Sequence, residues 1–362
     1  SPGPGAPFAR RLHLKQSYQT PSFTTVFGEQ GHMELSHLQG FFGSQEQQPT
    51  LTERQSSSVR RGDGSSVLDF KRAMGLEIAL SKVSATPEAL RGCLMALDFS
   101  GRAVSAEDVE RLLGKLPSAE EAQQLLKRAD APDKLRELER RVLPLCGVPS
   151  AERRLRILRV GMAHAATYEG LLRSLECVHQ AASEVLASTR LHSVLRCSLQ
   201  IANYINHGSL EGAKTFSVAS FSAFASFKLG SSSALHCLCL TLCTADFVRG
   251  LKADLGTVFV AARESAEAQQ EELRAFCASV ADVEEHLRAE ADEDVRARIT
   301  DLLRVLALEL ASLKQAEKRA RLRVEDAQRF LGENHAVLAK SEIFFSHIAG
   351  LVRHLEEFSS AA

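Results

Sequence analysis

The sequence of 362 residues contains no tryptophan and only three tyrosines, and its net charge is −1 with histidine neutral. Near neutrality argues against a nucleic-acid-binding protein, because displacing phosphate counterions needs a clustered excess of lysine and arginine. No run of about 18 apolar residues occurs, so we expect no membrane span. A charged and then apolar leader of the secretory type is also missing. These absences favour a soluble protein of the cytoplasm.

The eight cysteines lie among apolar residues in segments with a helical pattern, which is typical of free thiols in a reducing compartment. The cysteine-rich segment from His236 to Cys243 raises the question of a metal site, but on a helix only Cys239 and Cys243 share a face. The chain also lacks a phosphate-binding loop, a zinc-protease motif and a nucleophile elbow. We therefore expect no metal, no cofactor and no enzymatic activity.

The first 66 residues are rich in serine, glutamine, glycine and proline and carry only short apolar islands. Residues 1–11 are rich in proline and glycine and begin with a serine, which favours a fragment of a longer protein. Residues 12–43 hold the apolar islands and suit an extended segment that docks through a few anchors. Residues 44–66 are too polar to pack, so they are predicted to form a flexible linker.

From Val67 onward the apolar residues recur with helical spacing and strand signals are scarce, so the fold class is predicted to be all-α. Helix starts are indicated at Ser105, Ser118 and Ser150, each a hydroxyl before acidic first-turn residues. Two later segments show narrow apolar seams, which predict two long antiparallel helices. Their seam residues are Leu273, Phe276, Val280, Val283 and Leu287 in one, and Val295, Ile299, Leu302, Leu306, Leu310 and Leu313 in the other.

Two basic stretches, Arg153–Arg159 and Lys314–Arg323, are interpreted as solvated or ion-paired helix faces, with an anionic-surface reader as the alternative. The segment from Ile201 to Ser209 is more informative, because two asparagines stand inside a helix that runs into a glycine-containing loop. Asparagine is a poor interior helix residue, so Asn203 and Asn206 predict a specific polar role such as holding that loop.

This asparagine segment, Asn203-Tyr204-Ile205-Asn206-x-Gly208, resembles the Gly-Asn-Tyr-Met-Asn-x-Gly signature of the formin homology 2 family, with alanine in place of the first glycine. Upstream, Leu68–Leu80 is similar to the family's Leu-Asp-x-Lys-Arg pattern, and Leu112–Glu121 to its Leu-Leu-x-x-x-Pro-x-x-x-Glu. Arg154-Leu155 and Phe330–Asn334 match further family positions in the same order. The loop after the signature and the linker look most like the inverted-formin branch.

The resemblance implies a lasso at 12–43, a linker at 44–66 and helical knob, coiled-coil and post regions over 67–358, all within one elongated domain. It also implies a head-to-tail homodimer that encircles actin. At the dimer interface the resemblance places Leu14 and Phe27, where the family has two lasso tryptophans, together with Asn203, Tyr204, Ile205, Asn206 and Gly208. Because large aromatic anchors dominate interface energy, leucine and phenylalanine should hold the ring less tightly.

For actin contact the resemblance points to Ile78, Lys71 and Arg72 in the knob, and to Lys228 in the post. Ser217 and Ala223 occupy post positions where many family members have lysine. Losing two cations weakens charge complementarity to an acidic partner and lowers the association rate.

The implied function is binding of filament barbed ends with nucleation and elongation of unbranched actin filaments, by a cytoplasmic, cytoskeletal protein. One alternative is a degenerate scaffold that keeps the fold with weak or no actin binding. Another is a helical module that associates with microtubules or a membrane surface through the two basic stretches.

Overall fold

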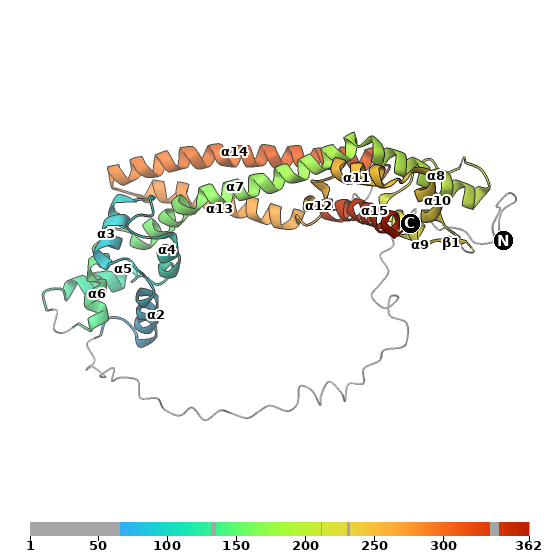
Figure 1. The fold of residues 1–362 in the computed structure, drawn as a ribbon. Coiled ribbons are helices and arrows are strands. Elements are labelled where there is room, and N and C mark those ends of the chain that lie inside the picture. The colour runs from blue at the N-terminus through green and yellow to red at the C-terminus, as the bar shows by residue number, and fades with distance from the viewer. Residues whose placement is uncertain (1–65, 132–134, 211, 230–231, 334–339, 362) are drawn as a thin grey trace, which may run out of the picture. The chain divides into compact units, whose positions relative to one another are not determined.

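The computed structural model describes residues 66–131, 135–210, 212–229, 232–333 and 340–361. The predicted segments 1–11 and 12–43, with Leu14 and Phe27, lie outside the described residues, as does the predicted linker apart from Ser66. The elements are labelled as in Figure 1. They are α2 (Phe70–Ser81), α3 (Pro87–Ala96), α4 (Ala106–Leu112), α5 (Ala119–Lys127), α6 (Glu137–Cys146), α7 (Ala151–Ala187), α8 (Thr189–His207), the 3₁₀ turn η3 (Val218–Ser220), α9 (Phe221–Ser226), β1 (Lys228–Leu229), β2 (Ser232–Ser233), α10 (Ala234–Leu242), α11 (Ala245–Asp254), α12 (Val258–Ala261), α13 (Ala266–Ala289), α14 (Glu293–Phe330) and α15 (Ser341–Ala361).

The described chain is helical apart from the antiparallel pair β1–β2, in which Lys228 lies opposite Ser233. The all-α prediction is therefore confirmed. The predicted starts at Ser105 and Ser118 are confirmed as well, since both hydroxyls accept a hydrogen bond from a first-turn amide. Ser150 does precede a helix, but it adopts a left-handed conformation and its side chain caps nothing among the described residues.

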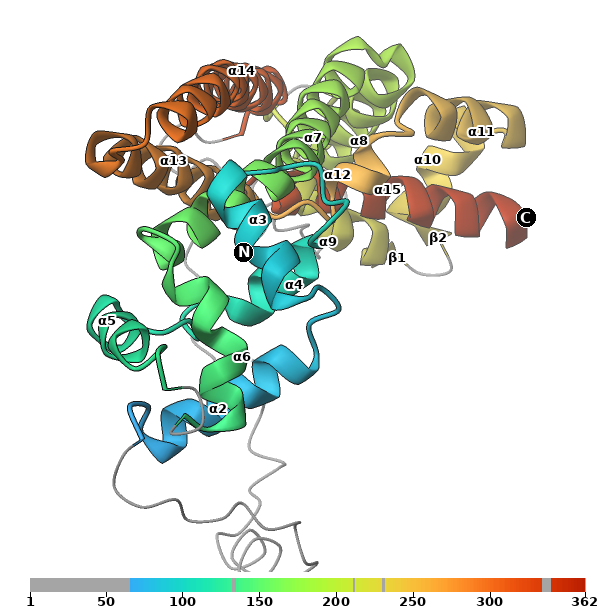
Figure 2. The ribbon, with the colours of Figure 1, turned by 90° about the vertical axis from the view of Figure 1, so that its left-hand side faces the viewer.

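Two long helices, α7 of 37 residues and α14 of 38, pack against each other and each spans about 55 Å at the rise of an α-helix. Figures 1 and 2 show them side by side, with α13 returning along α14 as the seam pattern predicts. The predicted seam residues, which lie on α13 and α14, are buried or half-buried.

The apolar interior consists of two separate clusters. The first core gathers side chains from α2 to α6, the first half of α7, α13 and the first part of α14. The second core gathers side chains from α8 to α12, α15, and the remaining parts of α7 and α14. Since α7 and α14 contribute to both clusters, they are the elements that join them.

A buried ion pair fixes the first core to the turn between α13 and α14. The guanidinium of Arg154, fully buried at the start of α7, donates from Nη2 and Nε to the two carboxylate oxygens of Glu290, at 2.8 and 3.1 Å. Its Nη1 donates to the carbonyl of Met95 at the end of α3, at 3.5 Å. The interpretation of this stretch as solvated or ion-paired therefore holds at Arg154 in its second form, since the side chain is ion-paired but buried, and it is unavailable to any surface partner.

Two buried carboxylates hold the ends of α2. Glu139 of α6 accepts three hydrogen bonds on Oε1, from the Ser66 hydroxyl and the amides of Val67 and Leu68, at 2.9 to 3.1 Å. Asp108 of α4 accepts from the amide and hydroxyl of Ser84, just beyond the other end of α2, at 3.1 and 2.7 Å. Burial disfavours ionisation of both groups, yet these hydrogen bonds hold the pKa of each carboxyl below its ordinary value.

We predict that Arg154→Met destabilises the fold by about 3 kcal/mol or more, because Glu290 is left as a buried charge without its partner. Urea unfolding measures the change. The matched control is Arg156→Met, which removes a half-exposed guanidinium 3.9 Å from Glu152 and should cost under about 1 kcal/mol. Equal losses in the two variants would contradict the role given to Arg154.

The depressed carboxyl pKa values also predict an acid-sensitive fold. A carboxyl whose pKa is lower in the folded state stabilises the protein above its unfolded pKa, near 4, and the stabilisation is lost as pH falls through the folded pKa. The free energy of unfolding should therefore fall steeply below about pH 4. Glu139→Gln should lower stability at pH 7 and make the fall shallower, whereas Glu120→Gln, an exposed change on α5, should keep the wild-type slope. Chemical denaturation as a function of pH tests this, and an unchanged slope in Glu139→Gln would count against it.

Candidate functional site

Helix α2 carries an exposed apolar stripe. Phe70, Met74 and Ile78 are spaced four residues apart, and the residues are 62%, 53% and 49% exposed. Spacing of four places side chains along one face of a helix. The opposite face of α2 is buried through Ala73, Leu76, Ala79 and Leu80. These three large side chains therefore have no role in the first core and are available to a partner.

The two basic residues predicted to contact actin differ in their surroundings. Lys71 is exposed and makes no ion pair with any described residue. Arg72 donates from Nη2 to Glu121 at 2.8 Å and to the carbonyl of Leu116 at 3.2 Å. Glu121 closes the capping box of α5 with Ser118, so Arg72 ties α2 to α5. Its guanidinium remains partly exposed.

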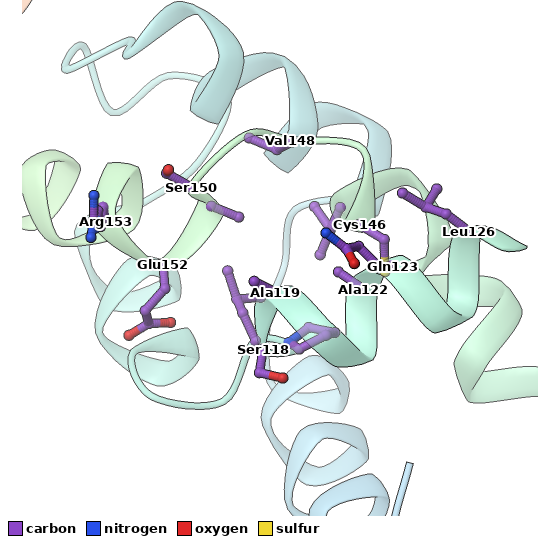
Figure 3. A pocket seen from close by; sticks show the side chains of 14 residues that line it. Ser118, Ala119, Ala122, Gln123, Leu126, Cys146, Val148, Ser150, Glu152 and Arg153 are labelled. Atoms are coloured by element: carbon purple, nitrogen blue, oxygen red, sulfur yellow. The ribbon is translucent and has the colours of Figure 1, made fainter. Parts of the chain in front are cut away.

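A groove of about 440 Å³ lies between α5, the end of α6 and the start of α7 (Figure 3). Its wall includes Leu116, whose carbonyl Arg72 contacts, so the groove neighbours α2. Apolar side chains such as Leu126, Leu145 and Val148 line much of it, with Glu152 and Arg153 among its polar residues. Burial raises the pKa of the Cys146 thiol in the groove to about 11, so this cysteine is not a nucleophile at neutral pH.

Sequence reasoning missed this groove, because no local pattern links three helix ends that are separated along the chain. It also missed Phe70 and Met74, although their spacing of four from Ile78 is visible in the sequence.

The asparagine segment at the end of α8 behaves as predicted at Asn203. Its buried amide donates to the carbonyls of Leu210 and Ala213, at 3.3 and 3.0 Å, and its oxygen accepts from the Ala213 amide at 2.9 Å. Gly208 ends α8 with a positive φ of 71°. A Cβ at Gly212 would lie 2.7 Å from Cδ2 of His207 and 3.0 Å from the Asn203 oxygen, so a larger residue there would require these side chains to shift. Asn203 therefore holds the loop after α8.

The neighbouring signature residues divide between core and surface. Ile205 is buried in the second core, Tyr204 is exposed and Asn206 is half-buried.

The three predicted contact residues further along the chain do not form one cationic site. The Ser217 hydroxyl donates to Glu333 at 2.9 Å, and the same carboxylate accepts from the Val218 amide at 3.0 Å. Ser217 is thus engaged inside the protein, beside a negative charge. Ala223 on α9 and Lys228 in β1 are both exposed. Among these positions only Lys228 supplies a cation.

No group of three metal-binding side chains occurs among the described residues. Cys239 and Cys243 are buried, whereas Cys237 is exposed. No single helix in the described part of the chain is long and apolar enough to cross a membrane, although α10 and α11 together, bent by 93°, satisfy the length and composition criteria.

Comparison with known proteins identifies the fold family. The model of the Formin Homology 2 Domain family matches residues 13–356. Formin-like protein 20 of Arabidopsis thaliana is 24% identical over 306 residues, which cover 82% of this chain and 18% of that protein. Formin-like protein 17 of the same plant is 28% identical over 147 residues, covering 41% of this chain and 29% of that protein. Formin-J of Dictyostelium discoideum is 28% identical over 146 residues, or 40% of this chain and 6% of that protein.

The matched regions thus span less than a third of the length of each of these three relatives. The family model, in contrast, covers nearly the whole of this chain, in agreement with the order of motifs from Leu68 to Asn334. The chain belongs to the formin homology 2 family.

Proposed function

We propose that this chain binds the barbed ends of actin filaments and promotes nucleation and elongation of unbranched filaments. The observation that carries the proposal is the α2 stripe of Phe70, Met74 and Ile78, in a chain that belongs to the formin homology 2 family. Its activity is binding and positioning of actin subunits, without bond chemistry. The proposed location is the actin cytoskeleton of the cytoplasm.

The stripe supports the proposal on energetic grounds. Each half-exposed side chain still has apolar surface to bury, worth about 1 kcal/mol per residue at about 25 cal/mol per Å². A few well-packed apolar residues dominate most protein interfaces. Because α2 is held at both ends by Glu139 and Asp108, the stripe is presented without a large ordering cost. Lys71, next to Phe70, adds a cation suited to an acidic partner surface.

The proposed working unit is a head-to-tail homodimer in which residues 12–43 of one protomer dock on the region around α8 of its partner. The loop held by Asn203 and the exposed Tyr204 are the surface offered for this contact. Leu14 and Phe27 would be the side chains that insert into the partner. They are smaller than the tryptophans found at these positions in the family, so the proposed dimer is weaker than one with two tryptophan anchors.

A degenerate scaffold with weak actin binding is the second candidate, and Ser217 and Glu333 favour it. Where many family members carry a lysine, this chain has a hydroxyl bonded to a buried carboxylate. The missing charge lowers the expected association rate with acidic actin.

Microtubule association through the basic stretches is less well supported. Arg154 is buried, and Arg321 pairs with Glu317 and Glu325 on its own helix. Fewer basic side chains than the sequence suggests are therefore available to an acidic partner.

Actin assembly followed by pyrene fluorescence tests the proposal, with sedimentation equilibrium to report the dimer. The wild-type chain should accelerate assembly or slow barbed-end growth, and Ile78→Ala should weaken the effect about tenfold or more, as expected for a central anchor. Met74→Ala should weaken it less. Leu308→Ala, an exposed apolar residue on α14, is the matched control and should behave as wild type.

No effect of the folded wild-type dimer on assembly would overturn the proposal and favour the scaffold. Equal losses in Ile78→Ala and Leu308→Ala would mean that α2 does not bind actin.

A further inference from the structure

Several hydrogen bonds fix the chain where the predicted linker meets the first core. Glu139 is fully buried, and its Oε1 receives hydrogen bonds from Ser66, Val67 and Leu68. Its Oε2 accepts from the Arg136 amide at 3.1 Å, which fixes the carboxylate in the first turn of α6. Leu68 itself is buried in the first core. Three consecutive residues are therefore bound to one carboxylate and followed by an apolar anchor.

Beyond the residues that Glu139 binds, the first turn of α2 has no side-chain cap of its own. Its N-cap residue, Asp69, makes no side-chain cap, and no acidic residue stands in the first turn to offset the helix dipole. Phe70 is mostly exposed and contributes little packing. A pull transmitted past Leu68 would therefore fray α2 from its N-terminus, where Phe70 begins the stripe.

We propose that Glu139 is a mechanical clamp that transfers tension in the linker to α6 and so protects α2, the proposed actin-binding helix. The inference rests on the proposed function, because a dimer whose two halves both bind actin would put tension on the linkers between them. Glu139 acts through the backbone of residues 66–68 and does not touch the partner, so it is a positioning residue.

Asp108 of α4 supplies the matched comparison, because it acts at the other end of α2. It is buried like Glu139 and holds Ser84 beyond the far end of α2. Loss of either buried carboxylate removes hydrogen bonds at one end of α2, and urea unfolding of both variants measures how much global stability each one loses. Only loss of Glu139 opens the path from the linker to α2.

Single-molecule pulling tests the clamp without actin. One handle is a tag on the N-terminus, and the other is attached by maleimide at Cys237, which is exposed. Release of residues 66–68 lengthens the chain by roughly 10 Å, and peeling of α2 lengthens it further. At a fixed load, Glu139→Ala should shorten the lifetime before this first step about tenfold or more, since three hydrogen bonds to a buried charge are lost.

Asp108→Ala should keep the wild-type lifetime of the first step, and Glu139→Gln, which retains an acceptor oxygen, should fall between wild type and Glu139→Ala. Hydrogen exchange at the amides of Val67 and Leu68 provides a second readout, with protection lost in Glu139→Ala and kept in Asp108→Ala. An unchanged first step in Glu139→Ala would overturn the clamp, as would an equal shortening in Asp108→Ala. If the wild-type chain failed to bind actin, the proposed function would be wrong. The pulling experiment contains no actin, so its result would still decide whether Glu139 is a clamp.

Discussion

The packing of α7 against α14 is the constraint on which the rest of the structure depends. Both helices supply side chains to both apolar cores, so neither core is complete without them. Their pairing also sets where the turn between α13 and α14 lies, and Arg154 binds Glu290 at that turn. Removing one partner of a buried ion pair lowers folding stability by several kcal/mol. This contact therefore holds the short helices of the first core against the long ones.

Helix α2 exposes three large apolar side chains, Phe70, Met74 and Ile78. Its other face is buried through Ala73, Leu76, Ala79 and Leu80, and buried carboxylates bind the backbone just before and just after the helix. The exposed stripe costs solubility and contributes nothing to the core, which fits a binding surface better than a structural one. The loop after α8 is held in a similar way, by a buried polar side chain. The amide of Asn203 binds the backbone of Ala213 and so fixes the loop.

The local patterns in the sequence predicted a large part of this structure. Helical spacing gave the all-α class and both long seams, hydroxyl caps gave the starts of α4 and α5, and an asparagine inside α8 predicted the held loop. Contacts between distant positions were beyond such patterns. Glu139 lies 71 residues from Leu68, and Ser217 lies 116 from Glu333. The sequence allowed Arg154 to be either solvated or ion-paired, because nothing nearby in the sequence marks Glu290 as its partner.

The most direct measurement of the central claim is site-specific photocrosslinking from the middle of the stripe. A photoreactive side chain at Met74 should crosslink to actin on filaments and lose the product when a barbed-end capping protein is added first. The same group at Leu308, exposed on α14, should give little product under either condition. Capping-sensitive crosslinking from Met74 alone is the predicted result. Equal crosslinking from both positions, or none from Met74 on a folded chain, would contradict α2 as the actin-binding helix.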